Sequence, residues 1–203
     1  TNLQSQLGQA FERWIAKVKI PQRKHFDGSI LHKDDLYLCF NYTSTLEKIY
    51  NISFNRICYI HGNSDRQPSE IIYGHGKKPQ RYQEISDKDL EWLKSEVSNE
   101  EFDRILIRQA YREQTYKNVD AEIFKHRAFF DYVGAHASEV YVLGHSISEI
   151  DLPYFETVLN NAFKCGRTLS WKVSYYNENE APILLQRLKS IGVDEECISI
   201  LKL

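Results

Sequence analysis

Apolar residues near the start of the chain recur every three or four positions, as they do on one face of an amphipathic helix. The residues on this face are Leu3, Leu7, Phe11, Trp14, Ile15 and Val18. They predict a helix over residues 1–18, and Pro21 is expected to end it. The first predicted element is therefore a helix that turns one apolar face toward a core.

Short apolar runs follow, each bounded by polar or glycine-containing segments. They predict strands over residues 35–40, 55–60, 139–143, 171–176 and 197–202. Helical patterns lie between them over residues 44–50, 152–164 and 180–191, with Asp151 as the N-cap and Pro153 in the first turn of the second helix. Strands that alternate with helices predict an α/β fold with a mainly parallel sheet covered on both faces.

The middle of the chain, residues 87–135, shows a helical pattern without any strand signal. It is rich in Glu, Lys, Arg and Gln, and its apolar residues fall on helix faces. We interpret it as a helical insert in, or cap on, a single α/β domain that spans residues 1–203.

Composition and charge exclude several classes of protein. The chain has 203 residues, of which 42% are hydrophobic and 27% charged, as in an ordinary globular domain and unlike a disordered chain or a disulfide-rich miniprotein. A net charge of −2 gives no electrostatic reason to expect broad, non-specific nucleic-acid binding. No apolar stretch is long enough to cross a bilayer, so we expect no membrane partner.

The four cysteines form no C-x-x-C pair, which speaks against zinc-ribbon and thioredoxin-like sites. A reducing, cytoplasmic location is therefore expected. The chain opens at Thr1 and contains no Met, which indicates the C-terminal part of a longer protein.

Polar clusters directly follow three of the predicted strands. They are Asn41-Tyr42-Thr43, His61-Gly62 and Gly144-His145-Ser146. In open α/β sheets, ligands bind beyond the carboxyl ends of the strands, so parallel neighbours would bring these clusters to one wet cleft. Asn41 could hydrogen-bond a ligand, and His61 could act as a general base near neutral pH. The alternative is that these residues, with Asp151 as a helix cap, only build turns.

A divalent metal is a second chemical interpretation. His61, His75, His145 and Asp151 together offer three imidazoles and a carboxylate. Their spacing matches no recognised metal-binding signature, so we expect no metal.

Several multi-residue motifs occur in a recognisable order. They are Phe40-Asn41-Tyr42-Thr43-Ser44-Thr45-Leu46-Glu47, Ile60-His61-Gly62, Ile72-Tyr73-Gly74-His75-Gly76, Leu143-Gly144-His145-Ser146 and Glu149-Ile150-Asp151-Leu152-Pro153-Tyr154-Phe155. With these motifs the chain resembles the AbiH family of bacteriophage abortive-infection proteins over residues 40–176, and more distantly sirtuin-like NAD-consuming domains. The AbiH family normally begins with a strand and a Gly-Asn-Gly-Phe-Asp loop, and this chain lacks both.

The resemblance implies a Rossmann-like (sirtuin-like) sheet flanked by helices, and an antiphage effector that hydrolyses NAD. It places Asn41 beside the nicotinamide ribose and makes His61 the general base. The NAD site implied in this way is lined by Tyr42, Thr43, Gly62, Gly144, His145, Ser146 and Asp151. The expected partners are a nucleotide ligand, a phage-derived trigger and further copies of the chain in an oligomer.

Two other functions fit the same residues. The first is a His/Asp metal-dependent hydrolase that acts on nucleic acid or a nucleotide. The second is a non-enzymatic module that senses a nucleotide or binds a phage protein through the helical segment. Metal analysis separates the first from an NAD hydrolase, and binding without turnover would identify the second.

Overall fold

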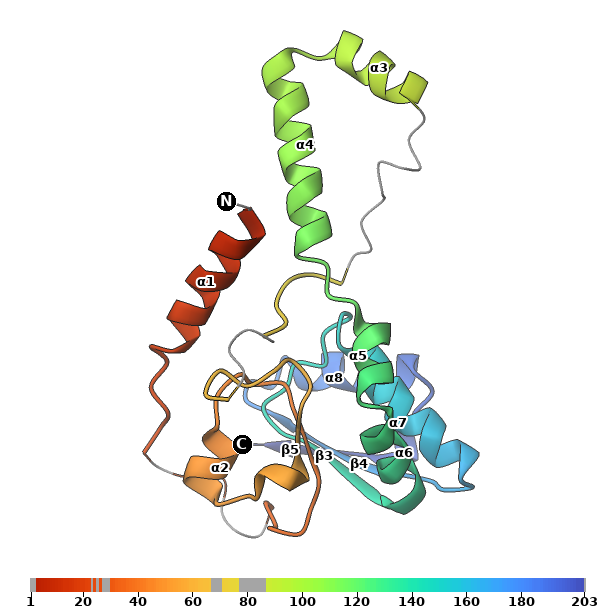
Figure 1. Ribbon diagram of the computed structural model, residues 1–203. Coiled ribbons are helices and arrows are strands. Elements are labelled where there is room, and N and C mark those ends of the chain that lie inside the picture. The colour runs from red at the N-terminus through yellow and green to blue at the C-terminus, as the bar shows by residue number, and fades with distance from the viewer. Residues whose placement is uncertain are drawn as a thin grey trace. The chain divides into compact units, whose positions relative to one another are not determined.

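The computed structural model describes residues 3–22, 24, 26, 30–66, 71–76 and 87–202 (Figure 1). The chain divides into two compact units, Thr1–Asn118 and Val119–Leu203. Each unit contains its own parallel strands and helices, as expected for an α/β protein.

The first unit holds two short strands and four α-helices among its described residues. In chain order these are α1 (Leu3–Ile15), β1 (Tyr37–Cys39), α2 (Thr45–Tyr50), β2 (Ile57–Tyr59), α3 (Asp87–Glu96) and α4 (Asn99–Gln114). β1 and β2 are parallel, with Tyr37 opposite Ile57 and Cys39 opposite Tyr59. A small core of Cys39, Ile52, Ile57 and Tyr59 supports this sheet.

Helix α1 carries Phe11 into a cluster of aromatic rings. Its ring centroid lies 5.2 Å from that of Tyr42 and 4.9 Å from that of Tyr73. The helix ends at Ile15, earlier than the predicted boundary, because the chain tightens there into a turn in which Val18 N–H donates to the Ile15 carbonyl. The last turn of the predicted helix over 1–18 is therefore wrong. Of its predicted apolar face, Ile15 is buried and Phe11 packs on other rings, whereas Trp14 is 60% exposed and Val18 lies beyond the helix.

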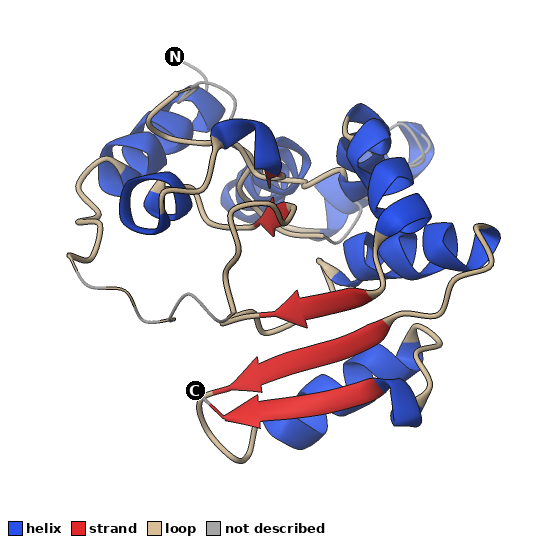
Figure 2. Ribbon diagram, turned by 90° about the horizontal axis from the view of Figure 1, so that it is seen from below, coloured by secondary structure: helices blue, strands red, loops and turns tan. Residues whose placement is uncertain are grey.

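The second unit is a three-stranded parallel sheet with four α-helices. Its elements are α5 (Val119–Lys125), α6 (Arg127–His136), β3 (Glu139–Val142), α7 (Leu152–Lys164), β4 (Ser170–Tyr175), α8 (Ala181–Ser190) and β5 (Ile198–Lys202). The strand order is β3-β4-β5, and Figure 2 shows these three arrows pointing the same way. Their carboxyl ends therefore share one edge of the sheet.

The two faces of this sheet differ. Trp171 and Val173 alternate on β4 with no exposed surface, and the Trp171 ring lies 6.5 Å from that of Phe155 on α7. On the opposite face Lys172 donates to Glu139 at 3.0 Å and to the exposed Tyr141 hydroxyl at 2.7 Å. This face is polar and partly exposed, whereas parallel strands buried on both sides are apolar on both faces.

The described strands form two sheets where the sequence predicted one Rossmann-like sheet. β1 pairs with β2, and β3 pairs with β4, but no described strand joins the two pairs. The predicted parallel pairing is thus confirmed within each unit, and a single Rossmann-like sheet that joins the two pairs stays a prediction.

The predicted helical segment 87–135 is helical. Its first half forms α3 and α4 in the first unit, and its second half forms α5 and α6 in the second. Helix α6 packs closely on α7, since a Cβ at Gly134 would meet Asn161 Cβ at 2.5 Å. Among the described residues, no helix combines the length and the hydrophobicity needed to cross a membrane.

Candidate functional site

The segments that carry Asn41 and His61 leave the first sheet at the same edge. β1 and β2 are parallel, and Cys39 at the end of β1 lies opposite Tyr59 at the end of β2. The segments that follow, which begin at Phe40 and Ile60, therefore leave the sheet at the same edge. Ile60 N–H donates to the Cys39 carbonyl at 3.1 Å, which extends the pairing by one step. The structure therefore brings these two predicted residues to one edge, as parallel strands require.

His61 lies inside the unit and does not face the wet cleft that was predicted for it. Its residue is 5% exposed, and its ring packs against those of Phe40 and Tyr42 at centroid distances of 5.4 Å and 6.2 Å. The strand-end pattern could not show this, because the packing of these two rings on His61 is a tertiary contact. Asn41 itself is exposed.

The neighbouring predicted residues hold the loop together. The Tyr42 hydroxyl donates to the Ile72 carbonyl at 2.9 Å, while the Tyr42 carbonyl accepts from Ser64. Thr43 shares a hydroxyl contact of 2.9 Å with Thr45. Gly62 adopts a φ of 86°, a conformation that favours glycine. These contacts match the alternative in which Tyr42, Thr43 and Gly62 build a turn.

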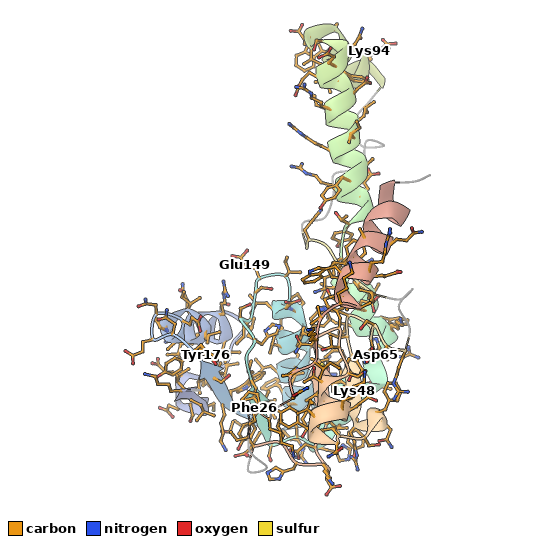
Figure 3. All side chains as sticks on the ribbon, turned by 90° about the vertical axis from the view of Figure 1, so that its left-hand side faces the viewer. Phe26, Lys48, Asp65, Lys94, Glu149 and Tyr176 are labelled. Atoms are coloured by element: carbon orange, nitrogen blue, oxygen red, sulfur yellow. The ribbon has the colours of Figure 1, made fainter. Side chains whose placement is uncertain are left out.

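A buried polar pair beneath this loop was missed in the sequence. Ser44 and Asn63 are each 3% exposed, and Asn63 Nδ2 donates to Ser44 Oγ at 3.1 Å. Ser44 precedes a helix and therefore suggests a cap, but its side chain does not cap α2. Asp65 N–H also donates to Asn63 Oδ1, and Lys48 lowers the pKa of the Asp65 carboxyl by a hydrogen bond of 2.6 Å; both side chains are labelled in Figure 3.

The thiol of Cys39 is not a nucleophile candidate. Burial raises its pKa to about 11, the contact with the Asn41 carbonyl opposes that shift, and the Glu47 carboxylate adds to it. The thiol therefore stays protonated at neutral pH and behaves as a small apolar side chain.

In the second unit, Gly144 begins a loop beyond the carboxyl end of β3. Its φ is 61°, and its N–H donates to the Ser174 hydroxyl at 2.9 Å. A Cβ placed at Gly144 would meet no described atom within 4 Å, so the space beside this glycine is open. Ser174 was missed in the sequence, although it stands near the carboxyl end of a predicted strand and the same rule would have found it.

His145 organises this loop through both nitrogens of its ring. Nδ1 accepts from Ile147 N–H at 2.8 Å, so the proton of the neutral ring is assigned to Nε2. Nε2 lies 3.6 Å from Asp151 Oδ2, which also accepts from the Ser148 hydroxyl at 2.8 Å. Asp151 occupies the N-cap position of α7, but its side chain makes no capping bond. The predicted N-cap position of Asp151 is therefore confirmed, but its carboxylate accepts from Ser148 and lies beside His145 without capping the helix.

Two further features hold the backbone of this loop in place. Ile147 has a φ of 50° and no exposed surface. Arg187 Nη1 from α8 donates to the Ser146 carbonyl at 2.6 Å. Nothing in the sequence marks Arg187 for this role, because 41 positions separate the two residues. The Gly144–Asp151 segment is thus a loop, held in place by several side-chain hydrogen bonds, at the carboxyl edge of the second sheet.

The four residues considered as metal ligands are divided between the units. His61 and His75 belong to the first, and His145 and Asp151 to the second. Across the part of the chain that the structure describes, no group of three or more His, Cys, Asp or Glu side chains is placed to hold a metal ion. His75 instead extends a backbone ladder, in which its N–H donates to the Thr115 carbonyl and its carbonyl accepts from Lys117.

Comparison with known proteins gives one match. A family model described as bacteriophage abortive infection AbiH matches residues 1–175. No curated protein matches the chain, and no solved structure matches it either. The matched residues include both the segment that carries Asn41 and His61 and the loop from Gly144 to Asp151.

Proposed function

This chain belongs to the AbiH family of bacteriophage abortive-infection proteins, and on that basis we propose that it is a nucleotide-binding antiphage effector that hydrolyses NAD. The reaction breaks the bond between nicotinamide and C1′ of the ribose. Water adds to C1′, nicotinamide leaves as a neutral base, and ADP-ribose and a proton are the other products. Loss of the cofactor would then stop growth of the infected cell after a phage-derived trigger.

The observation that carries this proposal is the loop from Gly144 to Asp151. It lies at the carboxyl edge of a parallel sheet, where α/β proteins bind nucleotides. The open space beside Gly144 lets a ligand approach the backbone, and the bond to Ser174 orients the loop without filling that space. A loop held this firmly needs little ordering on binding, which favours affinity.

The Asp151 carboxylate is our reason for proposing a sugar, in place of a phosphate, as the ligand of this loop. The N-terminus of a helix ordinarily attracts phosphate. Here the Asp151 carboxylate already stands at the N-terminus of α7 and would repel a second anion. Backbone carbonyls and a carboxylate suit ribose hydroxyls, which donate hydrogen bonds. We therefore assign the loop to a ribose.

For the first unit, considered by itself, we propose that Asn41 contacts a ribose hydroxyl of the nucleotide and that His61 takes a proton from a ribose hydroxyl or from the attacking water. The exposed Asn41 can reach a ligand directly. His61 is enclosed by Phe40 and Tyr42, which supports a base shielded from bulk water but limits its access. That enclosure favours one alternative, a sensor that binds the nucleotide without turnover.

The deciding experiment measures binding and turnover on the same samples. Calorimetry with NAD and with ADP-ribose reports binding, and nicotinamide release reports turnover. We expect His61→Gln to retain binding and to lose about 10²–10⁴-fold in turnover, the usual share of a general base. Asn41→Ala should weaken both.

Each result has a definite meaning. Binding of NAD by the unaltered chain without nicotinamide release would establish the sensor and reject the hydrolase. Turnover per folded molecule that is unchanged in His61→Gln would remove His61 from the reaction. Absence of binding by both ligands would reject the nucleotide site itself. Thr157→Ala, a change within helix α7, serves as the matched control and should leave binding and turnover unaltered.

A further inference from the structure

Tyr176 stands directly beyond the carboxyl end of β4, in the bend that leads to α8, and its side chain is labelled in Figure 3. The residue is 74% exposed. Its backbone is nevertheless held in place, because Tyr176 N–H donates to Glu180 Oε2 at 3.2 Å and Asn177 N–H donates to the same oxygen at 3.4 Å. The second unit therefore presents an aromatic ring to solvent from an ordered segment.

This segment lies close to the loop from Gly144 to Asp151. Gly144 N–H donates to Ser174 Oγ at 2.9 Å, so the loop contacts β4 only two positions before Tyr176. Two positions along a strand span about 6.6 Å, which is close to the separation of sugar and base in a nucleoside. The space beside Gly144 is open. A ribose held at this loop would therefore bring its base within reach of the Tyr176 ring.

The charges at this edge favour a neutral group beside the ring. The segments that leave the edge, residues 144–151, 176–180 and 202, carry four carboxylates and one ammonium group, namely Glu149, Asp151, Glu178, Glu180 and Lys202. Lys202 donates to Glu178 at 2.9 Å, and Arg187, which reaches the loop from α8, donates to the Ser146 carbonyl. Both cations thus already have acceptors. An excess of carboxylates repels a phosphate but not an uncharged base.

We propose that Tyr176 stacks on the purine base of the nucleotide whose ribose lies in the loop from Gly144 to Asp151. The inference rests on the proposed function, because it takes a ribose in that loop as given. A nucleobase is flat and neutral, and it stacks on exposed aromatic side chains. A purine covers more of the phenol ring than a pyrimidine does, so Tyr176 also selects between bases. Only two side-chain torsions of a tyrosine are ordered on binding, which keeps the entropic cost small.

Calorimetric titration of the full chain with adenosine, uridine and ADP-ribose tests this role. We expect Tyr176→Ala to bind adenosine and ADP-ribose at least about tenfold more weakly than the unaltered chain, and to lose its preference for adenosine over uridine. Tyr176→Trp should retain both, because an indole offers an equally large ring. The melting temperature should be unaltered in both variants, since the replaced ring is mostly exposed.

Phe163→Ala is the matched control. Phe163 is 79% exposed and lies near the C-terminal end of α7, which leads back to the opposite edge of the sheet. Its loss should leave the affinity for all three ligands unchanged. An equal loss of affinity in Phe163→Ala and Tyr176→Ala would overturn the inference, because the effect would not belong to the carboxyl edge.

The remaining outcomes separate this inference from the proposed function. Equal affinity of Tyr176→Ala and the unaltered chain for ADP-ribose would overturn the stacking role and leave the nucleotide site standing. Equal losses in Tyr176→Ala and Tyr176→Trp would also overturn it, because a stacked base needs only a ring at this position. Absence of binding of all three ligands by the unaltered chain would reject the nucleotide site and the stacking role together.

Discussion

The two units each contain a small parallel sheet, but they bury different kinds of side chain near it. In the first unit the buried residues include Ser44, His61 and Asn63, which are held by hydrogen bonds and ring contacts. In the second, the centre is Trp171 and Tyr154, both without exposed surface. Each unit also contains the other kind of contact, since the first has a small apolar core and the second buries Ser174. The difference is one of emphasis: the buried polar side chains of the first unit need aligned hydrogen-bond partners, and the large rings of the second need filled space.

The strongest test removes volume from the second unit. We expect Trp171→Ala to lower the free energy of unfolding by about 3–5 kcal/mol, since it deletes a fully buried indole and leaves a cavity. Urea unfolding followed by circular dichroism measures the change. Trp92→Ala is the control, because Trp92 is 63% exposed and its loss should cost under about 0.5 kcal/mol. Equal losses for the two tryptophans would contradict this account of the second unit.

A second test compares a glycine of each unit. A Cβ at Gly74 in the first unit would lie 1.8 Å from the Thr115 carbonyl oxygen, with a φ of 128°. Gly74→Ala should therefore cost about 3 kcal/mol, through both overlap and strain. Gly144→Ala in the second unit meets no described atom within 4 Å and should cost about 1 kcal/mol, through its positive φ alone. Thermal unfolding of both variants checks the ranking, and the reverse order would refute it.

A third test removes one partner of a buried polar pair in the first unit. Asn63→Ala leaves the Ser44 hydroxyl buried without its amide, which should cost about 1–3 kcal/mol. The double variant with Ser44→Ala should cost less than the sum of the two single changes, because the pair acts as one unit. Urea midpoints of all four proteins give the coupling, and strict additivity would show that the two side chains act independently.

The smallest expected effect is a difference between the two units in how their stability depends on pH. Burial, aided by Lys125, lowers the pKa of His126 in the second unit, although Glu122 lies 3.9 Å away. The unfolded chain therefore binds a proton more readily, and stability falls as pH falls through about 6.5. Between pH 7.5 and 5.5 we therefore expect His126→Gln to lose less stability than the unaltered chain, because the variant lacks this titrating group. The lowered pKa of Asp65 in the first unit acts only near and below its usual 3.8, so Asp65→Asn should leave that slope unchanged.

Much of the fold could be predicted from hydrophobic periodicity. The helix over residues 152–164 is confirmed to the residue, because Pro153 fixes its start and four buried side chains fix its face. The strands predicted over residues 139–143 and 171–176 are found as β3 (Glu139–Val142) and β4 (Ser170–Tyr175), within one residue at each end. The polar face of β3 and β4 could have been predicted too, since Glu-Val-Tyr-Val alternates in the way typical of a one-sided strand.

The candidate site was less predictable. The residues at the strand ends were found, but the burial of His61 depends on Phe40 and Tyr42 folding over it, which no local pattern records. Arg187 reaches Ser146 from a distant helix, and only the fold creates that contact. The parallel pairing of β1 with β2 agrees with the prediction. Which further strands are neighbours is a long-range property of the chain that no local pattern records.

Ile147 ties the shape of the ribose-assigned loop to the apolar interior. A β-branched residue at a φ of 50° is strained by about 1–2 kcal/mol, and the complete burial of its side chain, together with its N–H bond to His145, offsets that strain. A smaller side chain in the surroundings of Ile147 would loosen its hold and release the backbone. Substitutions in the apolar interior around Ile147 should therefore change the affinity of the loop for its proposed ligand, although the substituted residues do not contact that ligand. Suppressors of defects in this loop are then to be sought among core positions as well as at the site.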